Sequence, residues 1–493
     1  MWTRSFAVLS LIAVVAGHPQ AGGPDPLPSG DDAVTHALNR LTFGPRPDDV
    51  ARVKAMGLQQ WIDQQLDPSR IDDRALTATL ARLATLSLDS QTIQREYSGP
   101  AMVERRERQQ QAGQAGGAGG AGRGREPSEA QRKDRQVIAD LEEAKLLRAI
   151  RGERQLQEVL ADFWFNHFNV FAGKGATRNY LNEYEREAIG PHVLGNFRDM
   201  LEASAKSPAM LFYLDNWQNV SENPSAPRRR VAPSPTSGAA ASPTGLRPAR
   251  GINENYAREL MELHTLGVDG GYTQADVQNV ARALTGWTIT PRQGSSTMFV
   301  PRLHDDSAKT VLGHAFKAGG GEDDLERVLD ILAAHPSTAR HIATKLAIRF
   351  VSDTPPAALV DRAAARFTAT NGNLREVVRT IITSPEFFAP EAYRAKVKTP
   401  LEFVASALRA TGAEVRTALP LARELRDMGM PLYSCQPPTG YDDTATTWVS
   451  AGALVSRMNF AVALGKNQVR GVWIANPPAD LGQQIGSPGF QRR

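Results

Sequence analysis

The spacing of apolar residues predicts a chain built mainly from helices. The segment 154–171 places apolar or aromatic residues and one histidine three to four positions apart, at Leu156, Leu160, Phe163, His167 and Phe171. The last third of the chain continues with amphipathic stretches between short turns marked by Pro or Gly, at 323–336, 337–351, 355–370 and 374–388. Such a close succession of helices favours a large bundle-like helical domain over a parallel sheet.

One region departs from the helical period. Apolar and polar residues alternate in 288–290 and again in 297–300. Alternation with a period of two is typical of a strand with one buried face. The pattern predicts one short β-hairpin around residues 287–312, within an otherwise α-helical fold.

Two segments lack any apolar face. A Gly/Ala tract predicts an insertion at about 111–126, and a second insertion is predicted at about 221–250. The part 223–249 has six prolines, four arginines and no acidic residue. Such a composition indicates a disordered, solvated loop, although contact with an anionic surface or a role as a lid stays open.

The stretch 253–287 concentrates charged side chains in a helix-forming sequence. Glu254, Arg258 and Glu262 lie four residues apart and share one helical stripe, while Glu259 lies beside Glu262. If this acid–base–acid ladder is exposed it contributes little, and if it is buried it fixes the local fold. We predict the buried case, with Gly267 as the residue that ends the helix.

Local sequence also marks where several helices begin. Thr273 with Asp276 three residues later predicts a capping box, and Thr399 with Glu402 predicts another, with Pro400 at the first helical position. Ser207 before a proline predicts a further helix start.

Composition places the chain among globular proteins. Its 493 residues are 41% hydrophobic and 22% charged, with a formal charge of +4. This charge is small for the length, so no nucleic-acid partner is expected. The lone Cys435 excludes an intramolecular disulfide.

The first residues have the composition of a secretory signal peptide, predicted over 1–21. Arg4 supplies the positive charge, an apolar run of eleven residues extends from Phe6 to Ala16, and small residues follow. Eleven residues are too few to span a bilayer, and no later segment is long and apolar enough. We therefore expect an exported, periplasmic or extracellular protein with no membrane span after cleavage.

The segment 253–273, with the sequence NENYARELMELHTLGVDGGYT, is similar to the signature of the bacterial DUF1800 family. Further segments resemble motifs of the same family, at 36–45, 163–170, 304–309, 396–404, 436–441 and 448–460. The resemblance runs from about residue 31 to 465, apart from the two insertions, and leaves a C-terminal tail, 466–493. Tyr441 stands where the family often has Trp, a small departure.

The resemblance implies a fold and an exported location but no reaction, since the family has no assigned activity. Family members tend to be encoded beside a second exported family, DUF1501, which resembles sulfatase-type phosphatases. The resemblance thus implies a possible DUF1501-type partner.

The sequence contains no P-loop, no G-x-S-x-G, no H-E-x-x-H and no Cys pair. The candidate catalytic residues are therefore polar side chains from separate motifs: His167, Glu259, His264, His304 and Asp305. The residues proposed for binding or for a structural polar network are Asn166, Glu254, Arg258, Glu262 and Lys309. Histidines and carboxylates suit a divalent metal or metal-free acid–base chemistry, and the sequence does not choose between them.

Two hypotheses follow. In the first, the protein is an exported hydrolase in which His167, Glu259, His264, His304 and Asp305 converge on a cleft. We predict that His264 and His304, with Asp305, lie close together at a partly open cleft; the alternative left open is that His264 caps the carbonyls at the end of its helix and His304 anchors its loop. In the second, it is a non-catalytic helical binding or scaffold protein that acts with an exported DUF1501-type partner. For Asn166 and His167, hydrogen-bonded core positions and a place in a cleft both remain open.

Overall fold

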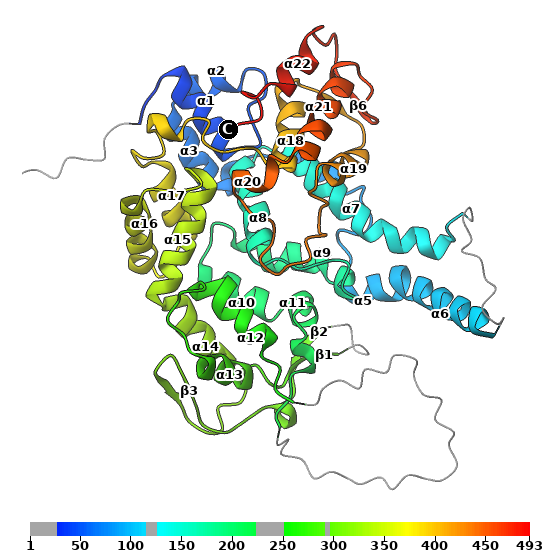
Figure 1. Cartoon of the computed structure of the whole chain (residues 1–493), viewed down its shortest axis with the longest axis vertical. Coiled ribbons are helices and arrows are strands. Elements are labelled where there is room, and N and C mark those ends of the chain that lie inside the picture. Colours follow the sequence, from blue (N-terminus) through cyan, green and yellow to red (C-terminus); the bar gives the residue numbers. More distant parts are fainter. Residues whose placement is uncertain (1–26, 115–125, 223–250, 291–295) are drawn as a thin grey trace, which may run out of the picture.

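The computed structural model describes residues 27–114, 126–222, 251–290 and 296–493. The predicted signal peptide and most of the two predicted insertions lie outside these ranges. Within them the chain is mainly helical, so the predicted fold class is confirmed (Figure 1).

Residues 31–151 form a group of helices whose first and last members lie near the C-terminal helices (Figure 1). Figure 1 shows α1 and α2 at the same end of the molecule as α21 and α22, while α6 and α7 run side by side away from the body. The bounds are α1 (Asp31–Leu41), α2 (Asp49–Met56), α3 (Leu58–Leu66), α4 (Arg74–Leu80), α5 (Ser90–Ile93), α6 (Gly99–Gln114) and α7 (Glu129–Arg151).

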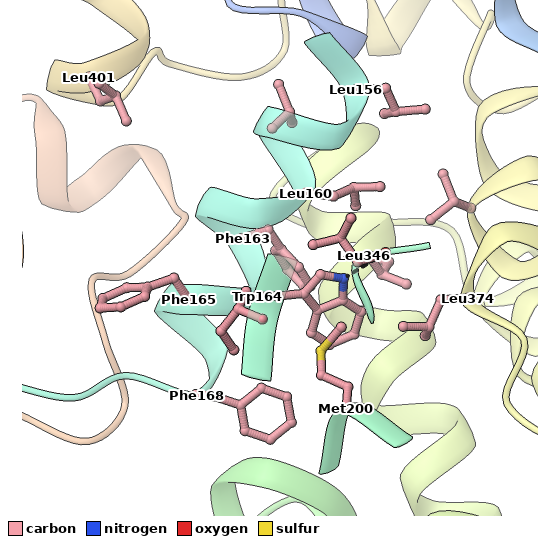
Figure 2. Close-up of a cluster of buried hydrophobic side chains, with 14 of the residues drawn as sticks. Leu156, Leu160, Phe163, Trp164, Phe165, Phe168, Met200, Leu346, Leu374 and Leu401 are labelled. Atoms are coloured by element: carbon pink, nitrogen blue, oxygen red, sulfur yellow. Dashed lines mark hydrogen bonds between the residues drawn. The ribbon is translucent and has the colours of Figure 1, made fainter. Parts of the chain in front are cut away.

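Helix α8 (Gln155–His167) lies at the centre of the hydrophobic core (Figure 2). Trp164 is fully buried, and its indole nitrogen donates a hydrogen bond to the Val193 carbonyl at 3.2 Å. Leu346 and Leu374 from later helices lie in the same cluster. An aromatic side chain of this size dominates the local burial energy, so α8 is held firmly on this face.

The next helices include the two that form from the charged stretch 253–287, α12 and α13. They are α9 (Leu181–Glu183), α10 (Phe197–Ala205), α11 (Pro208–Tyr213), α12 (Glu254–Met261) and α13 (Gln274–Ala283). Helix α12 continues into a π-helical turn, Glu262–Leu266, which ends at Gly267 with φ of +83°. A Cβ on this glycine would lie 3.0 Å from Nδ1 of His341, so the turn depends on a residue without a side chain.

The described residues contain three small antiparallel sheets, whereas the sequence predicted one hairpin. The predicted pair is β1 (Trp287–Thr290) with β2 (Ser296–Phe299), and β3 (Lys309–Val311) pairs with β4 (His314–Phe316). The third pair joins β5 (Glu414–Val415) to β6 (Val472–Trp473). Strands of two or three residues are too short to produce an alternating pattern, which explains why the sequence did not indicate them.

The C-terminal half consists of two further helical groups. The first contains α14 (Asp323–Ala334), α15 (Pro336–Phe350), α16 (Ala357–Ala369) and α17 (Leu374–Ile382). The second contains α18 (Pro400–Ala410), α19 (Leu419–Asp427), α20 (Ala445–Trp448), α21 (Ala451–Gly465) and α22 (Leu481–Gly486). The predicted capping boxes at Thr273 and Thr399 and the N-cap at Ser207 are present.

The tail 466–493 packs as part of the fold. Helix α22 contacts α21, and residues 491–493 pair with 396–398 through backbone hydrogen bonds, including Lys398 N to Gln491 O at 2.9 Å. Within the described ranges, none of the helices has the length and apolar character needed to traverse a membrane.

Candidate functional site

A cavity of about 390 Å³, called here the central cavity, lies among α8, α15 and the segment 430–448. Its charged lining residues are Asp162, Lys345, Arg349, Asp442 and Asp443, together with His167. The segments 163–170, 396–404, 436–441 and 448–460, which carry the family resemblance, each contribute at least one lining residue. Motifs far apart in sequence thus meet at one hollow.

The loop that forms one wall of the central cavity is held by an amide on α8. Asn166 donates from Nδ2 to the Tyr441 carbonyl at 2.7 Å and accepts from the Tyr441 amide at 2.7 Å. Asn169 donates to the carbonyls of Cys435 and Pro437 at 3.1 and 2.8 Å. Asn166 therefore positions the cavity wall, and its hydrogen-bonding groups are occupied by backbone.

Helix α15 contributes a stripe of basic residues. His341, Lys345 and Arg349 lie four residues apart and therefore share one face. Arg349 is paired with carboxylates, whereas Lys345 has no hydrogen-bond or ion-pair partner among the described residues. Burial lowers the pKa of Lys345 to about 8, although Asp443 and Asp442 oppose the shift. Lys345 is therefore a cavity amine that changes between its charged and neutral forms near pH 8.

Behind Arg349 lies a buried ion cluster. Glu402 lies 2.8 Å from Arg349 and 3.1 Å from Arg493, and Asp443 lies 3.5 Å from Arg349 and 3.8 Å from Lys396. Although burial opposes it, the nearby Arg349 and Arg493 lower the pKa of Glu402 to about 2. The cluster fixes the wall of the central cavity at Arg349 and Asp443.

A second cavity, of about 350 Å³, lies along the first half of α8. Asp162 lines both cavities and pairs with Lys145 at 2.8 Å. Glu158 lines the second cavity and has no hydrogen-bond or ion-pair partner in the described part of the chain. Burial raises its pKa to about 7; Arg148 opposes this shift and Glu185 adds to it.

His167 and His264 lie together and are each only 1% exposed, and His167 also lines the central cavity. Their ring centroids are 6.2 Å apart, and His341 lies 6.1 Å from His167. His167 Nε2 donates to the His264 carbonyl at 3.1 Å, and His341 Nε2 donates to the Leu263 carbonyl at 3.2 Å. Two imidazoles thus satisfy carbonyls of the π-helical turn.

These histidines are held in the neutral form. Burial, with a smaller effect of Lys345 and His341, lowers the pKa of His264 to about 3, and the pKa of His167 is also well below its usual value. Nδ1 of His167 and Nε2 of His264 have no hydrogen-bond partner among the described residues. A catalytic role for His167 or His264 stays a prediction.

The predicted burial of the Glu254–Arg258–Glu262 ladder is wrong. Arg258 is 41% exposed and Glu254 33% exposed, with 3.3 Å between Nη2 and Oε2. Glu262 instead accepts a hydrogen bond from the Tyr272 hydroxyl at 3.0 Å. At Glu262 the α-helix changes into the π-helical turn. Polar side chains of the following segment, such as Tyr272, then bind the carboxylates that would otherwise pair with residues of the same helix.

Glu259 lies half-buried on the same helix, without a hydrogen bond or ion pair to any described residue. Burial, and then the adjacent carboxylate of Glu262, raises its pKa. The expected proximity of these two carboxylates is thus present, but neither is among the residues that line the central cavity.

His304, Asp305 and Lys309 form a separate cluster. Nδ1 of His304 donates to the Thr285 carbonyl at 2.8 Å, and its Nε2 lies 3.3 Å from Oδ2 of Asp324. Lys309 also pairs with Asp324 and donates to the Asp305 carbonyl at 2.8 Å.

Asp305 binds Arg282 at 3.0 Å. Although burial opposes it, hydrogen bonds from Arg282 and Ser307 lower the pKa of Asp305 to about 2. The cluster connects α13, the loop before β3 and α14.

The expected open cleft around His264 and His304 is therefore not formed. The side chain of His264 packs against His167, Phe168 and Tyr256, whereas the side chain of His304 contacts Phe299 and Asp324. The two residues are only 1% and 2% exposed. The ring nitrogens of His304 bind Thr285 and Asp324, whereas Nε2 of His264 has no hydrogen-bond partner among the described residues, and the two imidazoles do not meet at an opening.

In the part of the chain that the structure describes, no group of three or more His, Cys, Asp or Glu side chains has the arrangement of a metal site. The residues that sequence reasoning missed are Lys345, Arg349 and the Asp442–Asp443 pair. The basic stripe at four-residue spacing within an apolar helix was the available signal for Lys345 and Arg349.

The structure defines a mainly helical protein with a polar cavity bounded by separate sequence motifs. The chain belongs to the family described as "Protein of unknown function (DUF1800)", whose model matches residues 36–488. No curated protein and no solved structure matches the chain in the same comparisons.

Proposed function

We propose that the central cavity binds a small polar ester and that the chain hydrolyses it by acid–base chemistry. The observation that carries the proposal is Lys345, an amine that lines the cavity without an ion-pair partner among the described residues and faces the carboxylates of Asp442 and Asp443. Cavities with convergent polar groups of shifted pKa are typical of reactive sites.

The chemistry follows from the proton affinity of Lys345. Because burial lowers its pKa to about 8, a substantial fraction is neutral amine at mildly alkaline pH. The neutral amine accepts a proton from water while the water oxygen attacks the ester carbonyl carbon. The C–O bond to the alcohol then breaks, and the leaving alkoxide takes the proton from the ammonium, which yields acid and alcohol.

The proposal is tested with p-nitrophenyl acetate as the probe. Hydrolysis by the wild type should rise with pH through about 8, and Lys345→Met should lower kcat/KM by about 100-fold or more. Lys345→Arg keeps a positive charge but cannot release its proton, so it should also be inactive while remaining folded. Lys133→Met, at an exposed position on α7, is the matched control and should retain activity.

An inactive wild type, or variants as active as the control, would remove the basis for this assignment. p-Nitrophenyl glycosides form a second arm of the assay, because paired carboxylates also serve glycoside hydrolysis. Cleavage of a glycoside without cleavage of the ester would contradict the ester assignment.

A non-catalytic role with a partner is favoured by a different observation. Helix α21 exposes Val455, Met458 and Val462, at 60%, 43% and 44%, on one face. The proposed partner is an exported DUF1501-type protein whose surface is apolar at the contact. Co-purification with such a protein, lost in Val455→Asp but retained in Lys345→Met, would support this role; no association would exclude it.

We further propose that the protein acts outside the cytoplasm. The support is the residue pattern of Arg4 followed by the apolar run to Ala16. N-terminal sequencing of protein recovered from the periplasm or medium should find a start near residue 22. An intact start at Met1, recovered from the cytoplasm alone, contradicts export.

A further inference from the structure

A third cavity, called here the C-terminal cavity, has a volume of about 370 Å³ and lies among α1, α18 and the segment after α22. Three cations, Arg394, Lys398 and Arg492, line it together with hydroxyl and amide groups. Among the residues that the structure describes, its lining includes no Asp or Glu. The positive charge that faces this hollow is thus not balanced by a carboxylate at its surface.

Lys398 is the buried member of this group. It is 4% exposed and has no hydrogen-bond or ion-pair partner for its ammonium among the described residues. Nζ lies 3.9 Å from the ring centroid of Phe490, a cation–π contact. The backbone pairing of 396–398 with 491–493 holds the lysine in this place.

The carboxylate that opposes the pKa shift of Lys398, Glu402, is paired with other residues. Glu402 is shared between Arg349 and Arg493 at 2.8 and 3.1 Å. Behind the cavity wall the ion cluster contains more cations than carboxylates. Its cations are Arg40, Arg349, Lys396, Arg457 and Arg493, and its carboxylates are Asp353, Glu402 and Asp443. The wall of the C-terminal cavity therefore carries a positive potential.

Several guanidinium nitrogens in this cluster also lack a partner in the described part of the chain. They include Nε of Arg40, Arg457 and Arg493. The other nitrogens of these guanidinium groups bind Glu402, Gln491 and backbone carbonyls, so the cations are held in place behind the cavity wall. The group that points to a negatively charged ligand is the ammonium of Lys398, which lines the cavity nearly fully buried and unpaired among the described residues.

We propose that the C-terminal cavity binds a small molecule through its phosphate or sulfate ester group. Arginine and lysine side chains are the usual partners of such oxyanions, and three of them face this space. A volume of about 370 Å³ is in the range of small-molecule sites, so it has room for a molecule larger than the inorganic ion.

Binding should depend on pH. Burial lowers the pKa of Lys398 to about 7; Glu402 opposes the shift, and Arg493, Arg457 and Arg394 reinforce it. Arg492 adds a further positive charge at the cavity. Sulfate keeps its charge across this pH range, so its affinity should fall as the pH rises through 7 and Lys398 loses its proton.

The test is calorimetric titration of the wild-type protein with sodium sulfate and with inorganic phosphate, at constant ionic strength maintained with chloride. Saturable binding of both ions is expected, with sulfate binding at least tenfold tighter at pH 6 than at pH 8.5. Lys398→Met should abolish binding, and Arg492→Ser, at an exposed position, should weaken it about tenfold without affecting folding. Arg416→Ser, an exposed control near α19, should bind like the wild type.

Absence of saturable binding in the wild type would overturn the proposal, and so would affinity in Arg492→Ser equal to that of the control. Ester hydrolysis at the central cavity is measured separately. Because Arg492 does not line that cavity, Arg492→Ser should hydrolyse ester normally, so either proposal can fail without the other.

Discussion

Replacement of Glu402 by glutamine tests whether the buried ion cluster holds the C-terminal half together. Glu402 lies between Arg349 and Arg493, and the three side chains are nearly fully buried. Glutamine has almost the same shape and retains the capping box with Thr399 at the start of α18. The substitution therefore removes chiefly a charge.

The free energy of unfolding should fall by roughly 3 kcal/mol in Glu402→Gln. Removal of one partner from a buried ion pair costs about 3–5 kcal/mol. The pKa of Glu402 falls from 4.5 to about 2, chiefly through Arg349 and Arg493 and against the effect of burial. At roughly 1.4 kcal/mol per unit, this shift corresponds to roughly 3 kcal/mol of stability at neutral pH. For a chain of this length, Tm should fall by about 3–5 °C.

The measurement is thermal and urea unfolding of the wild type, Glu402→Gln and Glu254→Gln. Glu254 also faces an arginine, Arg258, but at an exposed position, so its loss should cost at most about 0.5 kcal/mol. Because the pKa of Glu402 is lowered, its stabilisation is complete above about pH 4.5 and disappears as the pH falls toward 2. The difference between the wild type and Glu402→Gln should therefore shrink in acid. Equal shifts for both variants at pH 7 would show that the buried cluster stabilises the fold no more than the partly exposed Glu254–Arg258 pair does.

Three further outcomes are expected. Asn166→Ala releases both backbone groups of Tyr441, so hydrogen exchange of that amide should accelerate by at least tenfold; an unchanged rate would show that the clamp does not hold the loop. Lys309→Met leaves the Asp324 carboxylate buried without its ammonium, so unfolding free energy should fall by about 3–5 kcal/mol in urea titrations. Because the pKa of Glu158 is raised from 4.5 to about 7, its contribution to stability falls as pH rises through this range, and Glu158→Gln should remove that part of the measured pH dependence.

Features set by neighbouring residues were predictable from the sequence. The capping boxes at Thr273 and Thr399 form because donor and acceptor lie three residues apart, so local geometry decides them. The helical period and the first hairpin follow in the same way. The prediction failed at the Glu254–Arg258–Glu262 ladder: four-residue spacing correctly predicted the Glu254–Arg258 contact, but the predicted burial is wrong, because the ladder is partly exposed. Burial depends on which element packs on that face, and spacing within one helix does not contain this information.

The candidate site was only partly predictable for the same reason. Asn166 was identified within its motif, but its partner Tyr441 lies 275 residues further along the chain. Lys345 stood in a basic stripe of an otherwise apolar helix, and the spacing within that helix does not show which carboxylates lie opposite the stripe. The proximity of Lys345 to Asp442 and Asp443 arises only when α15 packs beside the segment 430–448.

The buried charges explain why segments far apart in the sequence pack together in one specific register. An apolar contact would allow residues 491–493 to slide along 396–398, whereas Arg493 satisfies Glu402 in one register only. Buried ion pairs rarely stabilise a fold more than well-packed apolar residues would, so their value here lies in specifying that register. The same register places Lys398 against Phe490 at the C-terminal cavity, while Arg349 and Asp443 of the same cluster line the central cavity. We infer that loss of the Glu402 charge would disturb both cavities together, because one ion cluster positions a wall of each.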